Sequence, residues 1–350
     1  MPRQCDYLYG VIRADAAKGY GPIGIDGGEV RAVPEGGIAA VAGTIDRVDF
    51  SQLSGERALQ YLAEHQRVLE RVMIDSPVIP LKFGTVADGD ARIAGILEAG
   101  RNEFARALGT FAGKIELDVS AFWTDLQAVL AEIAREEAVV SMKNEIAARG
   151  DVSMDQRIRL GQLVKQLLDQ RRGEIASELV VALRTRWPGL AVSPTHDDSV
   201  VLSAAVLIDR CDEGRFDETV EQLSRRYEDR LRFRCVGPLP PFSFATADVK
   251  TVDAGELDAA RERLELGESA NLVEVKAAHR RLLRQHHPDR SSDPAAADRT
   301  KDISAAYELL EQYAMNFKHT FGAGGAGAGT IIVRIRSLAE LRTEPLAHAA

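Results

Sequence analysis

The sequence predicts an α+β protein with a small all-α module behind it. Strand-like and helix-like segments alternate over the first 246 residues, only helical patterns occupy 255–318, and a glycine-rich run follows. The chain has 350 residues, 45% of them hydrophobic and 28% charged, which fits a globular protein of about two to three domains. The expected parts are an N-terminal α+β domain over 1–123, a helical hairpin with a second α+β domain over 124–246, a helical module over 255–318, and a tether and tail over 319–350.

The first domain is expected to be a sheet covered by helices on one face. β-forming residues from Tyr7 to Arg13 open it, and Glu56 to Ile74 places leucines at helical spacing. Pro80 makes its strand an edge or bulged strand, where an extended client segment could pair. The expected strands are 7–13, a pair within 28–45, 78–86 and 114–122, and the expected helices are 56–74 and 90–111.

The second domain is expected to begin with two long helices packed as a hairpin, over 124–149 and 154–186. Ser153 with Gln156 three residues later forms a capping box that starts the second helix. Strands over 190–193, 200–208 and 231–244 follow, with a helix over 216–230 and a linker over 245–255. The element order favours ferredoxin-like α+β folding in both domains. A strand-like stretch over 330–341 has no assigned partner.

A basic amphipathic helix is expected from Asn271. Asn271 is a favourable N-cap, Glu274 stands at the third helical position, and apolar residues recur at helical spacing. Pro288 ends the helix, and the apolar stripe from Ile303 to Leu310 packs back against it. The polar face of the first helix carries Lys276, Arg280, Arg281 and Arg284. These patterns predict an antiparallel helical hairpin with a polar loop at its tip.

The tip sequence His287-Pro288-Asp289, with these flanks, resembles the J-domain, the helical hairpin that docks on DnaK-type chaperone ATPases. The resemblance implies that His287, Pro288 and Asp289 contact the chaperone, and that Lys276, Arg280 and Arg284 steer it. Three features depart from the family pattern: His279 replaces an aromatic residue, an aromatic or apolar residue expected near Thr300 is missing, and the first helix, 257–266, is short and charged. A structural alternative is a hairpin whose charges only solvate it.

Three blocks in the first 246 residues resemble the gas vesicle proteins GvpF and GvpL: 7–12, 65–86 and 237–244. Leu239 departs from the family, which has an aromatic residue there. The resemblance implies two α+β domains that bind the hydrophobic gas vesicle shell protein during assembly, in the cytoplasm or on the vesicle. The implied partners are the shell protein, other gas vesicle proteins and, through the J-like module, a DnaK-type chaperone.

Composition argues against several other classes of protein. With 44 basic and 53 acidic residues the net charge is -9, which disfavours a broad nucleic-acid surface. Three scattered cysteines favour neither a zinc site nor a disulfide framework. The chain shows no export signal and no apolar run of about 20 residues, so we expect a cytoplasmic protein without membrane contact.

No constellation of catalytic residues appears. The run from Gly19 to Gly24 matches a dinucleotide-binding pattern, but no helix follows it. His65 lies on an apolar helical stripe and is expected to be a hydrogen-bonded core residue. We therefore expect no catalytic, metal or cofactor site, and a non-enzymatic assembly factor. A general J-protein co-chaperone and an enzyme on a ferredoxin-like scaffold remain alternatives.

Overall fold

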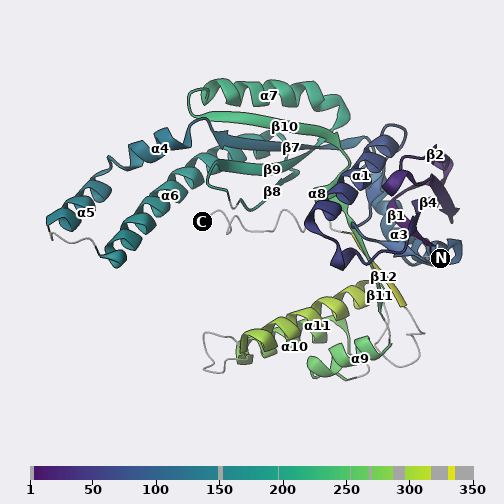
Figure 1. Cartoon of the computed structure of the whole chain (residues 1–350). Coiled ribbons are helices and arrows are strands. Elements are labelled where there is room, and N and C mark those ends of the chain that lie inside the picture. The colour runs from purple at the N-terminus through teal and green to yellow at the C-terminus, as the bar shows by residue number, and fades with distance from the viewer. Residues whose placement is uncertain are drawn as a thin grey trace. The chain divides into compact units, whose positions relative to one another are not determined.

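A computed structural model describes residues 4–148, 153–195, 197–252, 254–267, 270–286, 296–316 and 330–335 (Figure 1). The predicted α+β class with a helical C-terminal region is confirmed. Contacts divide the chain into two units, one containing residues 1–110 with 245–335 and the other containing 111–244. None of the helices in the described ranges is long and apolar enough to span a membrane.

The first unit is built on an antiparallel sheet whose strand order is β2-β3-β4-β1-β5, with β6 also paired to β1. Its central strand β1 is buried from Cys5 to Ile12, because it has neighbours on both sides. The strands are β1 (Gln4–Arg13), β2 (Gly19–Gly21), β3 (Val30–Glu35), β4 (Ile38–Asp46), β5 (Ile79–Pro80) and β6 (Val86–Ala87). The run from Gly19 thus begins in β2 and is followed by a short 3-10 turn and then by β3, so the chain turns into another strand as the sequence predicted.

Three helices accompany this sheet: α1 (Gly55–Met73), α2 (Asp90–Ala99) and α3 (Arg101–Thr110). The prediction of a single helix over 90–111 is therefore wrong. It is interrupted at Gly100, the C-cap of α2, because glycine has a low helix propensity and is favoured at helix ends. Short 3-10 turns elsewhere in the chain are η1 (Ala14–Ala16), η2 (Ile25–Gly27), η3 (Phe50–Gln52) and η4 (Arg210–Asp212).

The second unit contains an antiparallel sheet with the order β10-β7-β9-β8. Its strands are β7 (Lys114–Trp123), β8 (Leu190–Val192), β9 (Val200–Asp209) and β10 (Leu231–Leu239). The prediction that the strand near 114–122 completes the first domain is wrong, because β7 pairs with β9 and β10. Ile115, Leu117 and Val119 share one buried core with β9. Alternation along a strand identifies its buried face but not the sheet that it joins.

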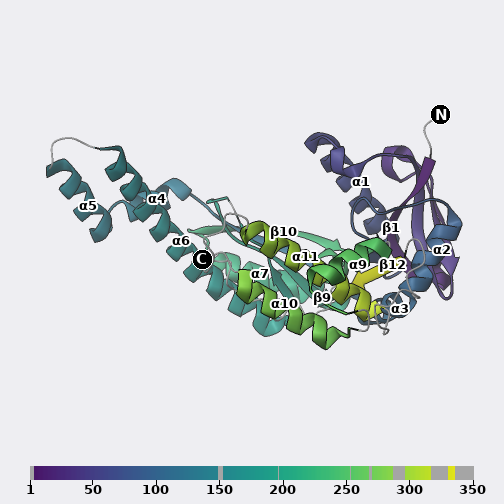
Figure 2. The same cartoon turned by 90° about the horizontal axis from the view of Figure 1, so that it is seen from below.

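The helices of the second unit are α4 (Leu126–Ile133), α5 (Glu137–Ala148), α6 (Met154–Arg186) and α7 (Glu213–Arg226), and the boundary with the first unit falls within the short helix α8 (Phe242–Ala245). The capping box of Ser153 and Gln156 is confirmed, and α4 and α5 both pack against α6 (Figures 1 and 2). The expected helix over 124–149 is divided in two. Arg171 of α6 pairs with Glu132 of α4 at 2.7 Å and with Glu136, in the turn before α5, at 2.6 Å.

The C-terminal region contains α9 (Ala254–Arg263), α10 (Leu272–His286) and α11 (Ala296–Asn316). It is flanked by β11 (Ala247–Val252) and β12 (Thr330–Ile335), which pair with each other. The prediction of a linker over 245–255 is therefore wrong. The first helix of the module, α9, begins and ends three residues earlier than the predicted 257–266. The strand-like stretch expected over 330–341 is a strand over its described part, 330–335, and its partner is β11. β11 and β12 pair with each other although about 80 residues separate them in the chain. The local sequence around either strand therefore does not reveal its partner.

The edge expected to receive a client is partly occupied by the chain itself. Leu81, just after β5, forms a parallel bridge with Ala247 of β11. The backbone N–H of Lys82 also donates to the carbonyl of Ala247 at 2.9 Å. An extended client would have to displace β11 at this point.

Candidate functional site

The predicted start of the basic helix is confirmed by its cap. The side-chain oxygen of Asn271 accepts from the N–H groups of Val273 at 2.9 Å and Glu274 at 3.1 Å. The Glu274 carboxylate accepts in return from the Asn271 N–H at 2.8 Å. Such a cap contributes about 1 kcal/mol to the stability of a helix. It fixes where α10 begins and therefore which side chains its exposed face presents.

One apolar core holds the three helices of the J-like module, by which we mean α9, α10 and α11. These helices lie together in both views (Figures 1 and 2). The predicted stripes of α10 and α11 face each other, and the first helix adds a third row. The buried residues are Leu257, Ala260, Leu264, Val275, Ala278, Leu282, Ile303, Ala306, Leu310 and Tyr313. The helical hairpin predicted from the apolar spacing is confirmed.

His279 stands where the J-domain family has an aromatic residue, and its ring still provides aromatic packing. Its ring stacks on Tyr307, with the centroids 4.0 Å apart and the planes 8° from parallel. Burial lowers the pKa of His279, although Glu311 and Glu308 act in the opposite direction. Its Nε2 atom is buried and has no hydrogen-bond partner among the described residues. A neutral imidazole therefore serves as an aromatic spacer between α10 and α11.

The predicted steering face contains two kinds of cation. Lys276 pairs with Glu311 of α11 at 3.3 Å and so braces the hairpin. Arg280 and Arg284 are exposed, and neither forms an ion pair with a described residue. The neighbouring Arg281 pairs with Glu265, beyond α9, at 2.7 Å. Arg280 and Arg284 are thus the guanidinium groups of α10 that are exposed and not already paired with a described residue.

The proposed contact residues His287, Pro288 and Asp289 lie outside the described residues. The helix that leads to them ends at His286, whose carbonyl accepts from the Thr300 hydroxyl at 3.0 Å. Thr300 therefore satisfies one of the carbonyls left free at the end of α10. Sequence reasoning regarded Thr300 only as a departure from the family and missed this role.

The first two gas-vesicle-like blocks form a core around His65. The Tyr7 hydroxyl and His65 Nδ1 are hydrogen-bonded at 2.9 Å, and the Gly84 N–H donates to the same hydroxyl at 3.2 Å. Burial lowers the pKa of His65 to about 4, so the ring is neutral near pH 7. Phe50 and Phe83 pack around these rings. The prediction of a hydrogen-bonded core histidine is confirmed.

The third block is held by a buried carboxyl group that sequence reasoning missed. Glu116 of β7 is 2% exposed, and its two oxygens hydrogen-bond the N–H and hydroxyl of Ser243, both at 2.8 Å. Burial outweighs these hydrogen bonds and raises the pKa of Glu116 to about 8. A lone glutamate in an alternating strand carries no signal of such a role. The family blocks therefore stabilise the fold from within.

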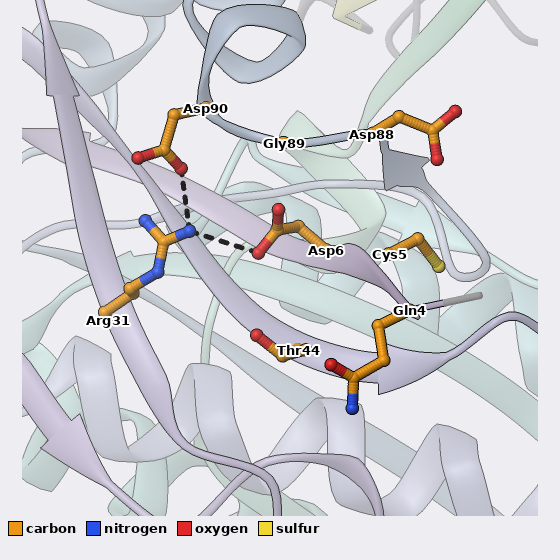
Figure 3. Close-up of a pocket in the computed structure, with 8 residues that line it drawn as sticks. All are labelled: Gln4, Cys5, Asp6, Arg31, Thr44, Asp88, Gly89 and Asp90. Atoms are coloured by element: carbon orange, nitrogen blue, oxygen red, sulfur yellow. Dashed lines mark hydrogen bonds and ion pairs between the residues drawn. The ribbon is translucent and has the colours of Figure 1, made fainter. Parts of the chain in front are cut away.

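Figure 3 shows a pocket of the first unit that is lined by a cysteine, an arginine and three aspartates, residue types that also occur in active sites. Arg31 lies between two of its carboxylates, 3.1 Å from Asp6 and 2.7 Å from Asp90, while Asp88 pairs with Arg47 at 2.9 Å. Burial raises the pKa of the Cys5 thiol, which disfavours a thiolate nucleophile. Gln4, Thr44 and Gly89 complete the lining. Nor do the described ranges contain a group of three His, Cys, Asp or Glu residues that could hold a metal ion.

Comparison with known proteins decides the family. A model of the gas vesicle synthesis protein GvpL/GvpF family matches residues 6–246. The chain belongs to the GvpL/GvpF family. Gas vesicle protein F of Microcystis aeruginosa is 24% identical over 242 residues, covering 68% of this chain and 97% of that protein. The crystal structure of GvpF from an Anabaena species matches with a TM-score of 0.56 at 22% identity, over 69% of this chain and 98% of that one, which shows a shared fold.

A second family matches the C-terminal region. A DnaJ domain model covers residues 262–315. Chaperone protein DnaJ of Trichodesmium erythraeum is 39% identical over 69 residues, which is 19% of this chain and 18% of that chaperone. The GvpL/GvpF part of this protein is therefore followed by a DnaJ domain, as the sequence resemblance indicated.

Proposed function

We propose that this protein is a non-enzymatic gas vesicle assembly factor. Its GvpL/GvpF part holds the hydrophobic shell protein, and its J-like module recruits a DnaK-type ATPase to that client in the cytoplasm or at the growing vesicle. The observation that carries the proposal is the presence of both parts in one chain. The capped α10 helix, the closed helical core and the two exposed arginines support an active module.

Covalent linkage explains why one chain would carry both activities. A shell subunit with exposed apolar surface aggregates unless it is held, and a chaperone must reach it while it is held. Linking the two modules raises the effective concentration of the ATPase near the client, to about the millimolar range for a short connection. Weak docking at Arg280 and Arg284 would then be sufficient.

The two activities can be separated by removing the J-like module alone. Val252 and Thr330 are paired at the end of the β11–β12 ribbon, so an Asn-Gly turn can join them in place of residues 253–329. This variant should still co-purify with tagged shell protein, but should restore gas vesicles poorly in cells that lack the full-length protein. Loss of shell binding in a variant with native-like circular dichroism would contradict the assignment of the client to the GvpL/GvpF part.

A further inference from the structure

The β11–β12 ribbon lies outside both family matches. The GvpL/GvpF match ends at residue 246 and the DnaJ match covers 262–315, whereas the ribbon consists of 247–252 and 330–335. One strand enters the J-like module and the other follows it. The two strands lie side by side in Figure 1, and their six residue pairs run from Ala247 opposite Ile335 to Val252 opposite Thr330. The ribbon is therefore an addition that brackets the J-like module.

One face of the ribbon packs on α2 and α3 of the N-terminal domain. A Cβ atom at Gly95 of α2 would lie 3.3 Å from Ile331 Cδ1, and one at Gly100 would lie 2.9 Å from Val333 Cγ1. Both helices contact β12, and Arg92 of α2 hydrogen-bonds Thr251 of β11. Glycine within α2 lowers helix propensity, but it allows the strand to approach closely.

The opposite face of the ribbon belongs to the J-like module. Ile332 is 1% exposed and lies in the same core as α9, α10 and α11, together with Val252. Successive side chains of a strand point to opposite faces, so Ile332 faces away from Ile331 and Val333. The single strand β12 thus contacts α2 and α3 with one face and contributes Ile332 to the core of the J-like module with the other.

The entry to the ribbon is fixed as well. The bridge between Leu81 and Ala247 ties β11 to the chain that follows β5, and Lys82 pairs with Asp248 at 3.4 Å. The attachment is therefore made by backbone pairing at one end, by a charged pair, and by close apolar packing along β12. A freely moving linker would make none of these contacts.

We propose that the β11–β12 ribbon is a two-sided joint that fixes the J-like module on the α2–α3 surface of the N-terminal domain. In this joint β12 makes apolar contacts on both sides. The inference rests on the proposed function for its purpose, because a fixed joint presents the ATPase to the held client in one orientation. The joint itself can be tested without a chaperone or shell protein, so that its failure is distinguishable from failure of the proposed function.

The test is a distance measurement between two spin labels in the full chain. The labels replace Leu59 of α1 and Val273 of α10, which are 69% and 76% exposed, after the exposed Cys211 and Cys235 are changed to serine. Double electron–electron resonance should give one narrow distance distribution. Ile331→Asp with Val333→Asp should make it at least about twofold wider, as expected for modules on a flexible connection.

Two further variants separate release of the joint from unfolding. Gly95→Leu fills the space beside Ile331 and leaves the ribbon and the J-like module unchanged in sequence, and it should also widen the distribution. Lys250→Asp alters an exposed ribbon residue and should leave it narrow. The proposal would be overturned if the distance distribution of the unmodified chain were as broad as that of the double aspartate variant. It would also be overturned if the distribution stayed narrow in both the double aspartate variant and Gly95→Leu.

Discussion

The GvpL/GvpF blocks and the J-like module use their most conspicuous residues in opposite ways. In the blocks, Tyr7 and His65 hydrogen-bond to each other in a buried core, and the half-buried Ser243 hydrogen-bonds the buried Glu116. In the J-like module, the apolar stripes close the core, while Arg280 and Arg284 remain exposed and without ion pairs among the described residues. The comparison teaches that a recognisable block can define a fold without locating a binding surface. The hydrogen-bonded residues of these blocks therefore do not mark a client-binding surface.

The largest expected effect sharpens this comparison at Glu116. Its folded pKa of about 8 lies above the ordinary value of 4.5, so between these pH values the folded state binds more protons than the unfolded state. Stability should therefore fall as pH rises through this window, by on the order of 4 kcal/mol. Glu116→Gln should remove this dependence in urea unfolding followed between pH 5 and 9. Parallel profiles for both proteins would show that Glu116 is not protonated in the core.

His65 should show a pH dependence of the opposite sign. Its folded pKa of about 4 lies below the ordinary 6.5, so the unfolded state binds more protons in that window. The resulting stability is present above pH 6.5 and is lost as pH falls toward 4, by on the order of 3 kcal/mol. His65→Phe cannot be protonated and should flatten this part of the profile. An imidazole that titrates near pH 6.5 by NMR would contradict its placement in the core.

A smaller effect should distinguish the two kinds of cation on α10. Arg280→Glu with Arg284→Glu should slow association with a DnaK-type chaperone roughly tenfold at low salt, because exposed complementary charges steer encounter. The difference should shrink as salt is added, since screening acts over about 8 Å at physiological ionic strength. Arg281→Glu provides a control on the same helix, because Arg281 already pairs with Glu265. Equal slowing by the control would indicate a general charge effect.

Local signals predicted the fold well, and long-range pairing was the main source of error. The caps at Asn271 and Ser153 were predictable because cap and partner lie three residues apart. The pairing of β7 with β9, and of β11 with β12, depends on partners far along the chain, which a pattern of alternating residues does not specify. Glu116 and Thr300 were missed for the same reason, since the groups that they bind are distant in sequence.

The central claim is that one chain holds the shell protein and activates a chaperone for it. His287→Gln tests it most directly, because a substitution in the polar loop that the sequence predicts there is expected to change stability by no more than about 0.5 kcal/mol. The measurement is single-turnover ATP hydrolysis by a DnaK-type chaperone in the presence of shell protein, with co-purification of the shell protein measured in parallel. The full-length protein should accelerate hydrolysis, and the variant should lose that acceleration while binding shell protein equally well. Equal acceleration by both proteins would contradict the claim.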